Sequence, residues 1–189
     1  MAEPYAKKVL VNAFVKLLNE KSFDSISVTE VTKEADVSRN TFYYWYRDLY
    51  DLVDDLLLYE TERLAQNRKE FASWQEGFLH ATAFVSENRK AVFHLYHSQN
   101  RNRLEAYLYH AILDDMTAFV RQQAKGLEVS QASIHNLAVF YSSALIGLTS
   151  IWLHDDMKED PEAYLASMGD MLEGNIRSSL VRAQKHGTE

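Results

Sequence analysis

The sequence predicts an all-α fold of about nine helices. Only two prolines and six glycines occur in 189 residues, and the first glycine is Gly77. There is no Asn-Gly or Asp-Gly pair and no sustained alternation of apolar and polar residues, so the signals of hairpins and strands are missing. Apolar residues recur instead at three- and four-residue steps, which is the spacing of one face of a helix.

Two helices are expected before residue 36. Apolar residues between Val9 and Leu18 mark a first helix over about 5–20. The segment SVTE has the form of a capping box, in which the Ser27 hydroxyl accepts from an exposed backbone amide and Glu30 reaches back to the cap. It begins a short second helix that ends near Ala35.

The remaining helices follow from caps and apolar spacing. Ser38 can cap a third helix through about Trp45, and Asp48 can cap a long fourth helix through about Gln66. Pro161 is acceptable in the first turn of a last helix. The helices expected after the fourth cover about 73–87, 89–97, 101–125, 130–155 and 161–185.

The distribution of charge bears on the kind of partner. The chain holds 20 Lys/Arg and 27 Asp/Glu, a formal net charge of −7. Residues 1–50 contain seven of each sign, so the negative excess lies in residues 51–189. The neutral N-terminal region can meet phosphates, although it lacks the basic patch expected of a DNA-binding protein.

Other features of the sequence indicate a cytoplasmic protein. The chain has no cysteine, which excludes disulfides and thiolate metal sites and suits a reducing compartment. The N-terminus does not have the pattern of a leader peptide, and no run of about 18 apolar residues predicts a membrane span. We predict no metal, no cofactor and no membrane partner.

Two short helices joined by a tight turn follow the first helix, which is the arrangement of a helix-turn-helix. In this motif the second short helix enters the major groove of DNA. Residues 9–57 resemble the DNA-binding domain of the TetR family of transcriptional repressors. The segments SVTEVTKEADVS and RNTFYYWYRDLYDLV carry the resemblance, where family members read S-V-x-x-I-A-x-x-A-G-V-S and then x-x-T-F/L-Y-x-x-F before an acidic-capped helix. The resemblance implies a helix-turn-helix DNA-binding domain of residues 1–50 and a helical regulatory and dimerisation domain of residues 51–189.

The aromatic cluster of the third helix divides into anchors and exposed rings. Phe42 and Tyr46 lie four residues apart, so they are expected to anchor this helix to the first helix and to Phe23. Tyr43 and Tyr44 project elsewhere. The rings of Tyr44 and Trp45 could pack on DNA sugar and phosphate or cover an apolar edge of the domain.

By the same resemblance, Thr41 and Tyr43 contact the DNA backbone, and residues at the start of the third helix read bases. Arg39 suits guanine and Asn40 suits adenine, while the alternative for both is a solvated helix start. The residues expected at operator DNA are Ser27, Thr29, Ser38, Arg39, Asn40, Thr41, Tyr43, Tyr44, Trp45 and Arg47.

Three positions depart from the family pattern. Asp36 stands where family members carry glycine, in a turn that takes a positive φ, a conformation that Asp tolerates better than most residues. Leu49 stands in the place of a phosphate-contacting lysine, and Trp45 in that of a histidine. Arg47, two residues earlier, is expected to supply the missing charge.

The resemblance also implies a homodimer, because TetR-like proteins pair their last two helices with those of a second chain. A twofold dimer presents two recognition helices about one DNA turn apart. Small residues around Gly147 would let two backbones approach closely. The residues expected at this interface are Ala144, Gly147, Leu148, Ile151, Met168, Leu172 and Ile176.

Family members keep a ligand cavity in the C-terminal domain. The residues expected to line it are Phe78, Phe93, Tyr96, His97, Tyr107, His110, Phe119 and Tyr141, and the alternative is that these rings fill the core. His94 and His97 have the spacing of a metal pair but lack a third ligand nearby in the sequence.

These features together predict a TetR-like repressor that binds operator DNA as a homodimer and is released by an effector. The same fold could instead act as an activator, or answer to a protein partner, as in a subgroup of Firmicutes regulators that the segment TFYYWYRDLYDL resembles. An enzyme is disfavoured, since there is no glycine-rich phosphate loop, G-x-S-x-G or H-E-x-x-H motif.

Overall fold

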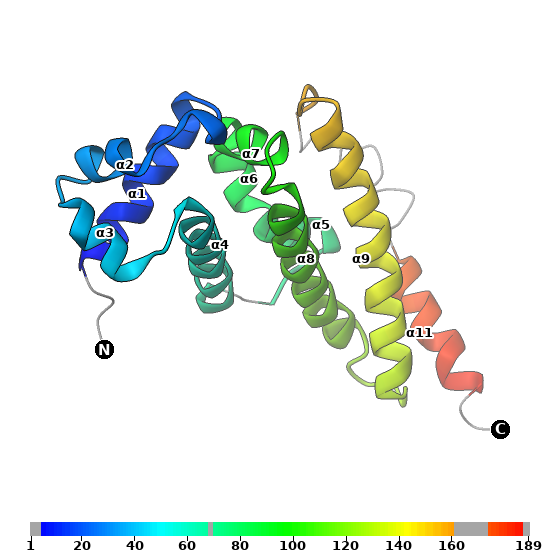
Figure 1. Cartoon of the computed structure of the whole chain (residues 1–189). Helices are drawn as coiled ribbons and strands as arrows, with labels where there is room; N and C mark the ends of the chain where they lie inside the picture. The colour runs from blue at the N-terminus through cyan, green and yellow to red at the C-terminus, as the bar shows by residue number, and fades with distance from the viewer. Residues whose placement is uncertain (1–4, 68–69, 161–173, 187–189) are drawn as a thin grey trace. The chain divides into compact units, whose positions relative to one another are not determined.

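The computed structural model describes residues 5–67, 70–160 and 174–186, and these residues form helices and no strand, as predicted (Figure 1). The helices are α1 (Tyr5–Glu20), a 3-10 turn η1 (Phe23–Ser25), α2 (Val28–Glu34), α3 (Arg39–Trp45), α4 (Leu49–Gln66), α5 (Trp74–Ala81), α6 (Ala83–Glu87), α7 (Arg89–Tyr96), α8 (Arg101–Gln123), α9 (Gln131–His154) and α11 (Asn175–His186).

The chain forms two compact units. One consists of Met1–Arg63 with Phe84–Tyr107, and the other of Leu64–Ala83 with Leu108–Glu189. In the first unit α1 packs against α2, α3 and α7. The expected domain boundary at residue 50 stays a prediction, and α7 and most of α4 share a compact unit with the three N-terminal helices.

Local hydrogen bonds account for the start of α2. The Ser27 hydroxyl oxygen accepts from the Glu30 amide at 3.3 Å, and a Glu30 carboxylate oxygen accepts from the Ser27 amide at 3.0 Å. Hydrogen bonds from the Lys21 ammonium and from Ser27 lower the pKa of the Glu30 carboxyl to about 2, so the cap is ionised at neutral pH. The predicted capping box is confirmed.

The turn between α2 and α3 adopts the backbone conformation that the glycine of the family pattern suggested. Asp36 has φ of 53°, within the left-handed region where Asp is one of the better tolerated residues after glycine. Ser38 then begins α3, and its hydroxyl oxygen accepts from the Thr41 amide at 3.1 Å. The turn therefore forms without glycine.

The predicted helix over 73–87 is wrong in one respect, because it is interrupted at Thr82. The Thr82 hydroxyl donates to the carbonyl of Phe78, four residues earlier, at 2.8 Å. Thr82 has φ of −101° and ψ of 11°, so α5 ends there and the chain continues as the separate helix α6. The same hydroxyl bond occurs within the unbroken α4 and α9, so it does not by itself account for the break. The first part of the expected helix over 161–185 lies outside the described residues, and α11 follows Gly174, whose φ is 74°.

α9 is apolar on more than one side. It packs against α11 through one face, and it is long and apolar enough by composition to cross a membrane, although only 33% of that window is buried. Our expectation that no segment reaches this length and hydropathy is thus corrected for α9. An apolar helix of this kind also occurs in soluble proteins when its exposed face binds another helix.

Candidate DNA-binding site

The short helix α3, which the sequence predicts to be the recognition helix, is held in place by its buried rings. Phe42 is 0% exposed, and its ring lies 5.5 Å from that of Tyr46, which is 4% exposed. The Tyr46 hydroxyl donates to an Asp55 carboxylate oxygen at 2.6 Å, and the Lys7 ammonium binds the other oxygen at 2.7 Å. The end of α3 is therefore fixed to α1 and α4.

Phe23 packs differently from what we expected. Its ring neighbours are Phe14 of α1, at 6.2 Å between centroids, and Tyr50 of α4, at 5.2 Å. Phe42 instead has Tyr43 and Tyr46 as ring neighbours. The anchoring role predicted for Phe42 and Tyr46 is consistent with their burial, but the contact predicted with the ring of Phe23 is not among these pairs.

None of the side chains predicted at operator DNA is buried. Tyr44 is 77% exposed and Tyr43 is 50% exposed. The guanidinium of Arg39 lies over the Tyr43 ring at 5.9 Å and donates to its hydroxyl at 3.4 Å. Asn40 is also exposed. The short helix α3 thus presents a cation, an amide and a phenol to solvent.

Two of the residues predicted at DNA also act as helix caps. Ser27 caps α2 and Ser38 caps α3 through their hydroxyl oxygens. Trp45 is half-buried, with its ring 4.8 Å from that of Tyr44 and 6.0 Å from the Lys7 ammonium. Of the two rings that the sequence left open, Tyr44 has the surface to meet a ligand, whereas Trp45 covers part of the domain.

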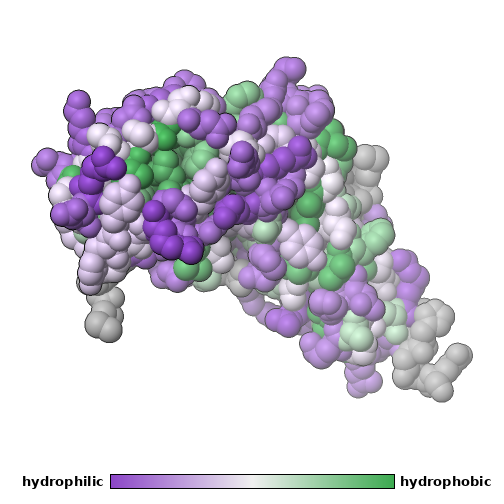
Figure 2. Space-filling model, in the orientation of Figure 1, coloured by the Kyte–Doolittle hydropathy of each residue, from purple (hydrophilic) through white to green (hydrophobic). Residues whose placement is uncertain are grey.

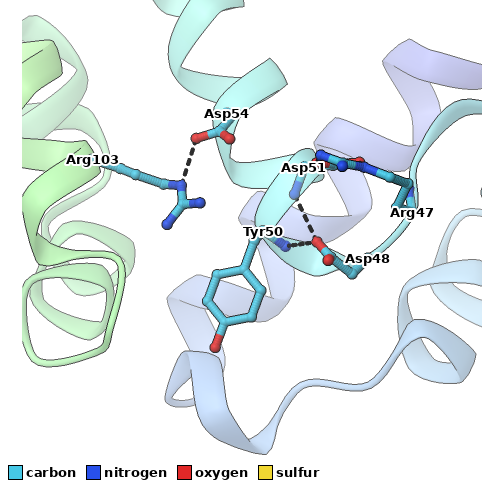
Figure 3. A network of polar contacts seen from close by, with 6 residues as sticks. All are labelled: Arg47, Asp48, Tyr50, Asp51, Asp54 and Arg103. Atoms are coloured by element: carbon cyan, nitrogen blue, oxygen red, sulfur yellow. Dashed lines mark hydrogen bonds and ion pairs between the residues drawn. The ribbon is translucent and has the colours of Figure 1, made fainter.

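A network of charges surrounds the start of α4, and its ion pairs were not predicted from the sequence (Figure 3). The Asp48 carboxylate accepts from the amides of Tyr50 and Asp51 at 2.8 and 3.0 Å, which confirms the predicted cap. Arg103 of α8 binds the Asp54 carboxylate at 2.7 Å and lies over the Tyr50 ring at 5.4 Å.

Arg47 is part of the same network. Its Nε and Nη2 atoms donate to the two oxygens of Asp51 at 2.7 and 2.6 Å. Arg47 lies between α3 and α4, so the spacing rule for helix surfaces does not apply to it, and the pair was not predicted from the sequence. The cation expected to replace the missing lysine is therefore already paired with a carboxylate.

Ion pairing extends across the N-terminal helices. Of the seven Lys/Arg in residues 1–50, those paired with carboxylates are Lys7, Lys16, Lys21 and Arg47. Lys8, Lys33 and Arg39 make no ion pair in the part of the chain that the structure describes. Two of the carboxylate partners, Asp51 and Asp55, lie beyond residue 50. Arg39, at the start of α3, is outside these pairs.

The residues predicted to line a ligand cavity are divided between the two compact units. Phe93, Tyr96, His97 and Tyr107 belong to the first compact unit, and Phe78, His110, Phe119 and Tyr141 to the second. His97 and His110 are exposed, whereas Tyr96, Tyr107 and Phe119 are buried. The described residues contain no cluster of His, Cys, Asp or Glu that could hold a metal.

A cavity of about 300 Å³ lies instead within the second unit, at the first turns of α5 and α11 and the end of α8. Phe119 is the one residue of the predicted set that lines it. The indole N–H of the 5% exposed Trp74 is buried without a hydrogen-bond partner among the described residues. The cavity lining comprises Ala72, Ser73, Trp74, Gln75, Phe119, Gln123, Gly174, Ile176 and Arg177.

The residues predicted at a dimer interface fall into three groups. Ala144, Gly147 and Ile151 of α9 are exposed, and Leu148 is half-buried. Ile176 is 4% exposed within the protomer and offers little surface to a second chain. Met168 and Leu172 lie outside the described residues. Figure 2 shows hydrophobic surface over α9, where Phe140 is 67% exposed and Ile151 is 57% exposed.

The described helices form a helix-turn-helix, a motif found in many DNA-binding proteins, and its second helix, α3, has an exposed polar surface. Residues 72–174, more than half of the chain, match the TetR family model described as "Transcriptional regulator C-terminal region". The chain belongs to the TetR family of transcriptional regulators.

One curated relative is the HTH-type dhaKLM operon transcriptional activator DhaS of Lactococcus lactis subsp. lactis (strain IL1403), which is 23% identical over 83 residues. That alignment covers 44% of this chain and 44% of the relative, so it spans less than half of either protein.

Solved structures support the fold over nearly the whole chain. The dihydroxyacetone kinase operon activator DhaS has a TM-score of 0.69 at 16% identity, covering 95% of this chain and 96% of that one. A TetR-family transcriptional regulator from Streptomyces coelicolor has a TM-score of 0.61 at 16% identity, and the alignment covers 97% of this chain and 90% of that one. The TetR family repressor AlkX from Dietzia sp. strain DQ12-45-1b has a TM-score of 0.57 at 12% identity, and the alignment covers 95% of this chain and 98% of that one.

Proposed function

We propose that this TetR-family regulator binds operator DNA through α3, with Arg39 and Asn40 at the bases. The observation that carries the proposal is the first turn of α3, where both side chains are exposed on a helix that the fully buried Phe42 anchors to the domain. Arg39 makes no ion pair in the described residues, so its charge is available to DNA. Arginine and asparagine can each form two hydrogen bonds with a base edge in the major groove.

Replacing Arg39 or Asn40 with alanine is expected to weaken binding to the preferred DNA by about 1–3 kcal/mol, which is the discrimination that one bidentate pair with a base supplies. Both side chains are exposed, so the free energy of unfolding should change by no more than about 0.5 kcal/mol. Fluorescence anisotropy with the preferred duplex and with single-base variants measures the affinity and the base preference. Asn12→Ala in α1 serves as a control, because Asn12 is exposed and is not among the residues expected at DNA. Unchanged affinity and base preference in both variants would exclude α3 as the reading helix.

The proposed regulator acts as a homodimer. Support comes from the exposed stripe of α9 that includes Phe140, Ala144, Gly147 and Ile151, spaced at i, i+4, i+7 and i+11 on one side of the helix. An isolated protomer would leave this apolar stripe in water. A second copy of α9 covers it and presents two recognition helices to two half-sites.

An effector is proposed to bind in the second compact unit. The cavity at the start of α5 supports this assignment, since it combines the Phe119 ring with the unpaired indole N–H of Trp74 and the Arg177 guanidinium. Such a lining suits a small molecule with an apolar body and an acceptor oxygen. The site differs from the one predicted from the sequence, which shares only Phe119 with it.

The direction of control has two candidates. Repression is supported by the resemblance to the TetR family of transcriptional repressors, and AlkX is named a repressor. Activation is favoured by DhaS, which is named an operon activator both as a sequence relative and as a solved structure. Transcription from the bound promoter after deletion of this gene separates them, because it rises for a repressor and falls for an activator. In either case the proposed location is the cytoplasm, where the DNA is.

A further inference from the structure

We propose that Asp51 limits the affinity of this protein for DNA phosphates by holding the Arg47 guanidinium in a bidentate ion pair. The proposal rests on the proposed DNA-binding function, because it concerns a cation at the end of the recognition helix. It adds a residue that is not itself expected at DNA but that controls how strongly a neighbouring cation can bind a phosphate.

The geometry of the pair is specific. Nε and Nη2 of Arg47 each donate to a different oxygen of Asp51, and the Arg47 backbone amide donates to Oδ2 at 3.0 Å (Figure 3). Three hydrogen bonds therefore converge on one carboxylate. The Asp51 side chain is 23% exposed and that of Arg47 is 87% exposed, so the carboxylate lies beneath a guanidinium that faces solvent.

Among the aspartates at the start of α4, Asp51 is the one whose ion pair holds a residue expected at DNA. Asp48 caps the helix, Asp54 binds Arg103, and Asp55 binds Lys7 and the Tyr46 hydroxyl. A general excess of negative charge would act through all four. The proposed effect is expected only from Asp51, because its carboxylate accepts from both Nε and Nη2 of Arg47.

The chemical consequence follows from what a phosphate requires. A phosphate binds arginine best through two parallel N–H donors, and Asp51 already occupies one such edge. A phosphate at Arg47 must displace the carboxylate or use the remaining N–H groups while close to a like charge. The hydrogen bonds from Arg47 also lower the pKa of the Asp51 carboxyl to about 2, so the carboxylate keeps its charge at neutral pH.

Removal of this competition should strengthen the part of DNA binding that is independent of sequence. That part depends on the number of phosphates neutralised, and log K falls with log salt by about 0.9 for each one. Release of Arg47 would allow each protomer to neutralise up to one more phosphate. The compensated charges of Lys7, Lys16 and Lys21 make this single cation a large fraction of what residues 1–50 can offer.

The test compares Asp51→Asn with Asp54→Asn. Both variants lose one negative charge, one helical turn apart, but Asp54 is paired with Arg103 rather than with Arg47. Asparagine keeps an acceptor for the Arg47 amide, so the helix start is preserved, and thermal unfolding checks this. Dissociation constants are measured for a scrambled duplex over a range of salt concentrations, and the two changes are repeated in an Arg47→Gln background.

Asp51→Asn is expected to tighten binding to the scrambled duplex by about 3- to 10-fold at low salt, with a salt slope steeper by about 0.9 per protomer. The gain from Asp54→Asn should be smaller. In the Arg47→Gln background the gain from Asp51→Asn should fall to that of Asp54→Asn.

Two results would overturn the inference in distinguishable ways. Equal gains from Asp51→Asn and Asp54→Asn, with the wild-type protein bound to DNA, would show that only net charge matters and would leave the proposed function standing. A wild-type protein and an Asp51→Asn variant that both fail to bind any duplex at low salt would overturn the proposed function and the inference together.

Discussion

Replacement of Phe42 with alanine is expected to destabilise the unit that carries the recognition helix by about 3–5 kcal/mol. The Phe42 ring is 0% exposed and lies against Tyr43 and Tyr46, so its removal leaves a cavity beneath a helix of two turns. Operator binding should disappear with it. Chemical denaturation followed by circular dichroism measures the stability, and fluorescence anisotropy measures the binding.

The matched control is Tyr44→Ala on the same helix. Tyr44 is 77% exposed, so its loss should change the free energy of unfolding by no more than about 0.5 kcal/mol, even if DNA affinity falls. A Phe42→Ala variant as stable as Tyr44→Ala would mean that Phe42 does not anchor α3, and that the recognition helix is held in some other way.

A second large effect is expected from Gly147→Asp, which should convert the proposed dimer to monomers. A Cβ atom at Gly147 meets no other atom within 4 Å in the protomer, so the substitution fits the isolated chain. In the dimer it would place a carboxylate in a close-packed interface without a partner, at a cost of several kcal/mol. Light scattering after size-exclusion chromatography measures the mass directly.

His135→Asp provides the control on the same helix. His135 is exposed and lies 12 residues before Gly147, about 120° around the helix. The substitution therefore places an aspartate on the same helix but away from the apolar stripe. His135→Asp is expected to remain dimeric. A Gly147→Asp variant that stays dimeric at micromolar concentration would place the interface elsewhere.

The N-terminal helices could be predicted well because their signals are local. The Ser27 and Glu30 capping box, the Ser38 cap and the Asp48 cap each act within three residues, so the sequence contains the whole interaction. The backbone of Asp36 was also predictable, since its place in the motif requires a positive φ. These interactions do not depend on how distant parts of the chain pack.

Features that depend on distant residues were not predicted. Arg103 meets Asp54 across 49 positions, and no pattern in the sequence relates them. The break at Thr82 was missed for a different reason, because the apolar spacing continues through it and its hydroxyl bond to Phe78 also occurs in unbroken helices, as at Thr61 and Thr149. The predicted ligand residues were chosen because they are aromatic, and aromatic side chains fill cores as readily as they line cavities, so only Phe119 meets the cavity of the second unit.

The central claim, that α3 of a dimer reads operator sequence, is tested most directly by selecting bound duplexes from a random pool with wild-type protein and with Arg39→Ala. We predict an enriched inverted repeat for wild type, with half-site centres separated by about one helical turn of DNA or a multiple of it. We also predict degeneracy at one symmetric base pair for Arg39→Ala. Recovery of no enriched sequence by the wild-type protein, or of the same sequence with equal preference by both proteins, would contradict the claim.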